Sequence, residues 1–180
     1  MNEFYIVVDI EAAGPNPGNY AMLSLGACTL SDPRDVFYIE LEPDKEKVDD
    51  GAMSIHKLSM EELSKRGKPP KQAMGEFEYW IMQVVPEGKR PVFVAFNAPF
   101  DWMFVNDYMH RYIGHNPFGH KALDIKALFM GLHGVSWEET SHAVISNFYF
   151  KDRELLHHAL EDALMEADLL DHILSEMEEK

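Results

Sequence analysis

The segment Pro91–Phe96 constrains the fold of this chain most, because it is apolar throughout and bounded by turn-forming residues. A run this short fits a strand better than a buried helix, and uniform apolarity is typical of a strand covered on both faces. Phe4–Ile10, rich in β-branched and aromatic residues, is a second buried strand. Strands of this kind lie in a sheet that helices cover, so an α/β domain is predicted.

Three further segments complete a predicted five-stranded mixed sheet. Met22–Leu30 and Val36–Leu41 follow the first strand after short turns, which favours an antiparallel meander. A short strand is predicted just before Asp124. Helices flank these strands, and Ser59 followed by Glu62 is typical of a helix start. The longer helices are expected over Pro69–Val85, Phe100–Tyr112, most of Leu123–Ser146 with a break at Gly131 and Gly134, and from about Glu154 onward.

The composition indicates one ordinary globular domain over residues 1–180, with 46% hydrophobic and 26% charged residues. Cys28 is the only cysteine, so no intramolecular disulfide can form and nothing indicates an oxidising compartment. No apolar stretch approaches the roughly 20 residues of a membrane span, and Asp9 interrupts the first one. We therefore expect a cytoplasmic location and no membrane partner.

The net charge of −15 weighs against tight binding of long duplexes, because proteins that hold nucleic acid by its phosphates present basic surfaces. Acidic residues are dense in 161–180, whereas Lys65, Arg66, Lys68 and Lys71 cluster elsewhere. Bound divalent metals reverse the local sign of the field. Short nucleic-acid ends or short oligonucleotides remain compatible with this charge.

Two acidic motifs follow the buried strands. Asp9 and Glu11 are two residues apart, so their carboxylates share one face of the first strand, where a hard cation such as Mg²⁺ would relieve their repulsion. The segment 97–101 places Asp101 near a helix start beside a central strand, a usual position for sites in α/β sheets. Taken alone, each has a plainer interpretation: a solvated strand end, and an acid that favours the helix dipole.

A third motif lies on the last helix. Asp162 is at the edge of the apolar stripe, where it can face the sheet, and His157 lies near the helix start. An imidazole is a natural general base for water. His158 competes for that role, since it is one helical turn from Asp162. A surface histidine pair on an acidic helix is the plainer alternative.

Together, and in this order, the motifs resemble those of the DEDDh family of 3′-to-5′ exonucleases, which includes oligoribonuclease, ribonuclease T and polymerase proofreading subunits. The resemblance extends from about Ile6 to Leu174 and includes Val94–Trp102 and Ile55–Ser59. It implies a ribonuclease H-like exonuclease fold: an α/β domain with a five-stranded mixed sheet flanked by helices. It also favours His157 over His158 as the base.

Carried onto this sequence, the resemblance implies a metal-dependent 3′-to-5′ exonuclease that binds two divalent ions, Mg²⁺ or Mn²⁺. Two such ions can activate water and neutralise the leaving 3′ oxygen. Asp124 resembles an aspartate that family members keep nearby and is given a supporting role. The implied residues are the metal ligands Asp9, Glu11, Asp101 and Asp162, the general base His157, and the substrate contacts Ile10, Ala12, Asn97 and Phe100.

The sequence departs from the family around the terminal-nucleotide grip. Ala12 and Ala13 stand where threonines usually follow the glutamate, and Pro15 stands where a large apolar residue is common. The expected substrate is a single-stranded 3′ end, with RNA favoured over DNA, and family members of this sort are often homodimers. The alternatives are a hydrolase of very short oligonucleotides and a non-catalytic nucleic-acid-binding module of the same fold.

Overall fold

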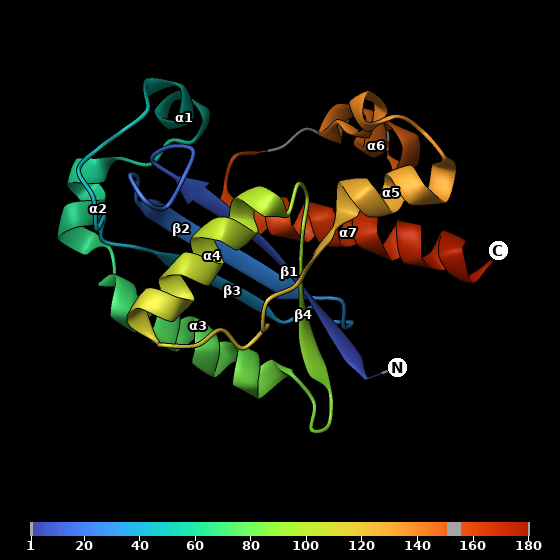
Figure 1. Ribbon diagram of the computed structural model, residues 1–180, viewed down its shortest axis with the longest axis horizontal. Helices are drawn as coiled ribbons and strands as arrows, with labels where there is room; N and C mark the ends of the chain where they lie inside the picture. The colour runs from blue at the N-terminus through green and yellow to red at the C-terminus, as the bar shows by residue number, and fades with distance from the viewer. Residues whose placement is uncertain (1, 151–155, 180) are drawn as a thin grey trace.

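The computed structural model describes residues 2–150 and 156–179, and a five-stranded mixed sheet forms its centre (Figure 1). The strands lie in the order β3-β2-β1-β4-β5. They run over Glu3–Ala12 (β1), Met22–Thr29 (β2), Val36–Glu40 (β3), Arg90–Ala95 (β4) and Ala122–Asp124 (β5). The predicted five-stranded mixed sheet is confirmed.

The central strand β1 combines both kinds of strand pairing. It pairs antiparallel with β2, which pairs antiparallel with β3, as the short turns predict. On its other side β1 pairs parallel with β4, which pairs parallel with β5. Since helices form the crossovers before β4 and β5, the carboxyl ends of β1, β4 and β5 meet at one edge of the sheet.

Helices cover both faces of the sheet (Figure 1). Alternate residues of β1, Ile6 and Val8, pack in the core under α3 and α4, whereas Val7 packs with Val94 under α5 and α7. The helices are α1 (Asp50–Ile55), α2 (Met60–Arg66), α3 (Pro70–Val84), α4 (Pro99–Tyr112), α5 (Ile125–His133), the 3₁₀ turn η1 (Trp137–Thr140), α6 (His142–Tyr149) and α7 (Ala159–Glu178).

Most predicted helix boundaries hold, and two do not. Ser59 caps α2 by accepting from the Glu62 N–H, as its motif predicts. Gly134 ends α5 in a left-handed conformation, but Gly131 lies inside that helix and does not break it. The last helix begins at Ala159 rather than near residue 154, which lies outside the described residues. No helix of the described residues is long and apolar enough to cross a bilayer.

Gly26 lets α7 approach the sheet closely. This glycine lies on β2 directly opposite Asp9 of β1. A Cβ atom added to it would lie 2.3 Å from the backbone carbonyl carbon of Ala159 and from the backbone nitrogen of Leu160. The first residues of α7 therefore rest on bare strand backbone, and this contact sets the height of the helix above β1.

We expect Gly26→Ala to lower the free energy of unfolding by about 2–3 kcal/mol, because α7 must move away from the sheet. Gly75→Ala is the matched control, since Gly75 lies within α3 and a Cβ there meets nothing within 4 Å. This control should instead gain about 0.5–1 kcal/mol from helix propensity. Urea unfolding of both variants measures the two changes, and equal stabilities would contradict the close-packing argument.

Asp44 links the segment after β3 to helix α4. Its carboxylate accepts hydrogen bonds from the hydroxyls of Tyr108 (2.5 Å) and Tyr112 (2.8 Å) and from Nη1 of Arg111 (2.6 Å). The Tyr108 hydroxyl also accepts from the backbone N–H of Met22 at 2.8 Å, which extends the link to β2. Burial alone would raise the pKa of Asp44, but these hydrogen bonds, with one from Lys45, lower it to about 2.

A pKa below its ordinary value of 3.8 means that the Asp44 carboxylate stabilises the fold above about pH 4, and that this stability is lost as the pH falls toward 2. We expect Asp44→Asn to lower the free energy of unfolding at pH 7 by about 1–3 kcal/mol. The difference from the wild type should shrink between pH 4 and pH 2. Thermal unfolding over this range measures it, with the exposed Glu87→Gln as control; a constant difference would contradict the assignment.

Candidate active site

Asp9 and Glu11 project from β1 toward α7, as their spacing predicts. Val7, on the same face, packs beneath α7, while Ile10 packs in the core on the opposite face. Both acids lie within the strand rather than at its end, because β1 continues to Ala12. The β1–β2 register shifts between Glu11 and Ala12, and bulges of this kind often redirect a side chain beside a site.

Asp101 reaches the same place from the first turn of α4. The last register pair between β1 and β4 is Val7 with Val94, so β1 has no partner strand beyond it on that side. The Asp101 carboxylate binds this unpaired edge of β1: its Oδ1 accepts a hydrogen bond of 3.1 Å from the backbone N–H of Ile10. Asn97, with a left-handed φ of 64°, makes the turn between β4 and α4. The turn and the hydrogen bond together orient the buried carboxylate.

Helix α7 brings Asp162 and, just before its first residue, His157. Asp162 is buried, and its Oδ1 accepts a hydrogen bond of 2.9 Å from the backbone N–H of Leu156. His157 is exposed and has a left-handed φ of 53°, an uncommon conformation for a residue other than glycine. One ligand atom each from Glu11, His157 and Asp162 lie within 4.8 Å of one another. The backbone conformation thus holds the imidazole at the carboxylates.

The second histidine of the pair lies elsewhere. His158 is the residue before α7, and its ring stacks on Tyr38 of β3, with centroids 4.5 Å apart and planes 23° from parallel. Among the described residues, the potential cation-binding group contains His157 and not His158. The left-handed backbone of His157 turns the chain between the two residues, so the His157 imidazole lies at the carboxylates while the His158 ring packs on β3.

Glu166 is a site residue that the motifs did not indicate. It lies one helical turn after Asp162 on the same face of α7, and its side chain is only 3% exposed. Its Oε2 accepts a hydrogen bond of 3.1 Å from the backbone N–H of Phe96, directly after β4. The sequence does hold a signal for it: an acid four residues after Asp162, at the same edge of the apolar stripe.

The acids of the site repel one another in a desolvated place. Burial raises the pKa of Glu11 to about 7, with a further contribution from Asp162. Burial also raises the pKa of Asp9, and repulsion from Asp101 and then Glu166 adds to it. The pKa values of Asp101 and Glu166 are raised by burial too, against the lowering effect of their backbone hydrogen bonds.

Carboxylates that are this close and this buried lose charge or gain a cation. The carboxylates offer hard oxygen donors, which are the ligands that Mg²⁺ and Mn²⁺ prefer, and the His157 imidazole lies beside them. The residues present therefore fit one or more divalent ions of this kind, which Asp9, Glu11, Asp101 and Asp162 would hold.

The residues predicted to contact substrate lie around this cluster. The side chains of Ile10 and Ala12 are buried in the core, so only their backbone borders the site. The backbone carbonyl of Ala12 lies 3.2 Å from Nε2 of the buried His56, which fixes the end of β1. Asn97 is exposed, and Phe100 is half-buried against the α3–α4 core.

Asp124, predicted to support the site, caps α5 by accepting from the backbone N–H of Ala127. Its charge contributes to the repulsion that raises the pKa of Asp101. The predicted supporting position near the site is therefore compatible with the structure, although the side chain's own hydrogen bond is to the helix that follows.

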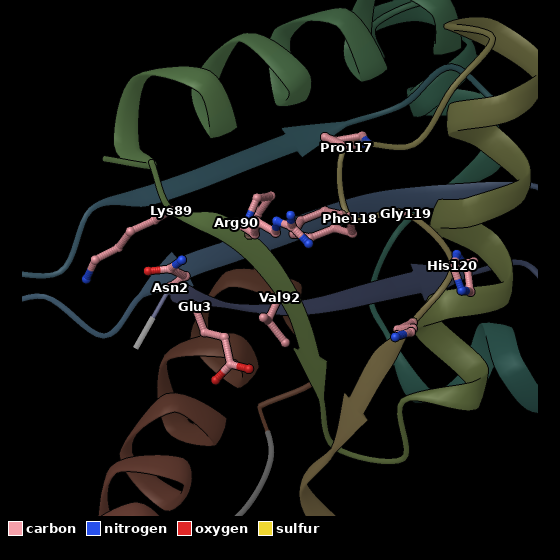
Figure 2. A pocket seen from close by; sticks show the side chains of 11 residues that line it. Asn2, Glu3, Lys89, Arg90, Val92, Pro117, Phe118, Gly119 and His120 are labelled. Carbon is pink, nitrogen blue, oxygen red and sulfur yellow. The ribbon is translucent and has the colours of Figure 1, made fainter. Parts of the chain in front are cut away.

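A well-formed cavity lies away from these acids. It has a volume of about 760 Å³, and Figure 2 shows it at the amino-terminal ends of β1 and β4, with Lys89, Arg90 and His120 around it. The carboxylates lie toward the opposite ends of the same two strands, and none of them lines the cavity. Cavity size therefore does not locate the chemistry of this protein.

A mixed sheet of this order, with buried acids where the carboxyl ends of its central strands meet the first turns of two helices, defines the ribonuclease H-like exonucleases. The chain is similar in fold to the nuclease domain of 3′hExo, a DEDDh family member, bound to rAMP, with a TM-score of 0.79 and 14% identity over 96% of this chain and 92% of that one. The cell-death related nuclease CRN-4 gives a TM-score of 0.75 and 16% identity, covering 96% and 64% of the two chains.

The chain belongs to the DEDDh exonucleases: the RNase_T family model, described as Exonuclease, matches residues 6–170. It is also similar to the 3′-5′ DNA exonuclease Cap18 of Escherichia coli, with 42% identity over 178 residues that cover 99% of this chain and 95% of that protein. The protein is therefore a 3′-to-5′ exonuclease, and the resemblance found in its motifs is confirmed.

Proposed function

We propose that this exonuclease removes nucleoside 5′-monophosphates from the 3′ end of single-stranded DNA in preference to RNA, with two divalent ions and His157 as general base. The convergence of Asp9, Glu11, Asp101 and Asp162 with His157 carries this proposal. Divalent ions bound there would supply a water of lowered pKa and neutralise charge on the phosphoryl and leaving oxygens. The four carboxylates would hold the ions, and their excess negative charge suits two of them better than one.

The protein's own part in the hydrolysis is positioning and proton transfer. The water oxygen bonds to the terminal phosphorus while the bond from phosphorus to the 3′ oxygen of the preceding nucleotide breaks. His157 accepts the proton that the water loses, because it is exposed and lies beside Glu11 and Asp162. The terminal nucleotide leaves with a 5′-phosphate, and the released 3′ oxygen takes up a proton from solvent to become the new 3′-hydroxyl of the shortened strand.

The preference for DNA rests on the relative Cap18, which is named for DNA and matches almost the whole chain. The sequence motifs alone favoured RNA, by likeness to oligoribonuclease and ribonuclease T, and that preference stays a prediction for the same assay to decide. The net charge of −15 favours recognition limited to the last few nucleotides, and very short oligonucleotides are therefore included as substrates in the test.

Digestion of labelled substrates tests the reaction directly. A 5′-labelled single-stranded DNA, its RNA counterpart and a dinucleotide are incubated with Mn²⁺ or Mg²⁺, and the products are separated by length. We expect a ladder that shortens from the 3′ end, faster for DNA than for RNA. Asp101→Asn should abolish cleavage yet remain folded, because an amide oxygen can still accept from the Ile10 N–H.

Each contrary result points to a different correction. Faster cleavage of RNA would overturn the DNA preference, and cleavage of the dinucleotide alone would assign the protein to very short substrates. No cleavage by a folded wild type that binds Mn²⁺ would favour a non-catalytic nucleic-acid-binding module.

Substitution of each histidine in turn distinguishes the role of His157 from that of His158. We expect His157→Ala to lower kcat by about 10²–10⁴-fold, the usual contribution of a general base, with little change in the affinity for Mn²⁺. His158→Ala should keep most of the activity, since that ring stacks on Tyr38 rather than facing the carboxylates. Steady-state kinetics on one labelled DNA gives both values, and a greater loss in His158→Ala would reverse the assignment.

A further inference from the structure

Glu166 is one of two buried acids on α7, and the sequence motifs account only for the other, Asp162. Its side chain is 3% exposed, whereas the other acids of this helix, Asp162 excepted, are exposed or partly exposed. Within the described residues it forms no ion pair; burial raises its pKa, and repulsion by the charges of Asp101, Asp162 and Asp124 raises it further. A buried carboxylate with only like charges around it is destabilising unless a cation offsets it.

The hydrogen bond of Glu166 connects two parts of the site. Phe96, whose backbone N–H it binds at 3.1 Å, is the residue between β4 and the turn at Asn97. That turn leads within one helical turn to Asp101, whose carboxylate in turn binds the backbone of β1. Glu166 thus ties α7, the helix that carries Asp162, to the segment that orients Asp101.

A neutral side chain would be enough for this structural tie. The amide oxygen of glutamine accepts a hydrogen bond as the carboxylate oxygen does, and it brings no charge. The negative charge of Glu166 therefore has no evident function in the metal-free fold, where it only adds to the repulsion around Asp9 and Asp101. It becomes favourable when divalent ions occupy the cluster.

We propose that Glu166 is a positioning residue of the cation site, a fifth carboxylate that strengthens divalent-ion binding through its charge and aligns Asp101 through the Phe96 N–H. This inference rests on the proposed function, because it requires the four carboxylates named above to bind divalent ions. Mutation of a residue that orients or polarises the metal ligands without binding the metal itself commonly lowers metal affinity by about 10–100-fold.

The test measures Mn²⁺ binding to the full chain by calorimetry, alongside thermal unfolding of the metal-free protein. We expect Glu166→Gln to raise the dissociation constant for Mn²⁺ by about tenfold or more. Its metal-free melting temperature should equal or exceed that of the wild type, since the repulsion is relieved and the hydrogen bond kept. Glu166→Ala should lose both affinity and metal-free stability, because the Phe96 N–H loses its acceptor.

Glu161→Gln is the matched control, since Glu161 is an exposed acid in the first turn of the same helix. It should bind Mn²⁺ as the wild type does, which separates a local effect from a change in overall charge. Equal Mn²⁺ affinity of wild type and Glu166→Gln would overturn this inference alone. Absence of Mn²⁺ binding by the wild type would overturn the cation site of the proposed function, and this inference with it.

Discussion

The rest of the structure depends on holding mutually repelling carboxylates together in a buried place. Three of them are fixed in the same manner, each by a backbone N–H of another segment: Asp101 by Ile10, Asp162 by Leu156 and Glu166 by Phe96. A backbone donor stabilises a carboxylate without introducing a counter-charge, so the cluster keeps its negative charge for a cation. Lysine or arginine partners would have neutralised the site and removed its capacity to bind metal.

This arrangement requires helix α7 to lie close to the sheet, and small residues make that possible. Gly26 of β2 lies under the start of the helix, and Ala163 and Ala167 are fully buried between α7 and the strands. With larger side chains there, the carboxylate of Asp162 would stand farther from those on β1. The packing of the core and the geometry of the site therefore depend on the same quantity, the distance between α7 and β1.

Features set by residues close together in the sequence could be predicted, whereas features set by contacts between distant segments could not. The sheet, most helices and the motif acids could be predicted, because strand alternation and helix periodicity are local properties of the sequence. The start of α7 at Ala159 could not, since the Asp162 carboxylate binds the Leu156 N–H and residues 156–158 are not helical. The orientation of His158 depends on Tyr38 of a distant strand, and the burial of Glu166 depends on contact with β4. The four-residue spacing places Glu166 on the same helix face as Asp162, but the strands that these side chains contact cannot be read from the local sequence.

The charge of the whole protein suggests how the proposed substrate is bound. At −15, the protein repels a polyanion at long range, and many of its basic side chains, such as Arg34, Arg66 and Arg111, are already paired with acids. The basic cavity of Figure 2 lies at the other end of β1 from the acids. On the proposed function, attraction to the strand would come mainly from divalent cations bound by the carboxylates, which act over a few ångströms in a site shielded from salt. On this argument recognition is limited to the terminal phosphates, and metal binding and substrate binding are the same requirement, because without cations the site would repel the strand it cleaves.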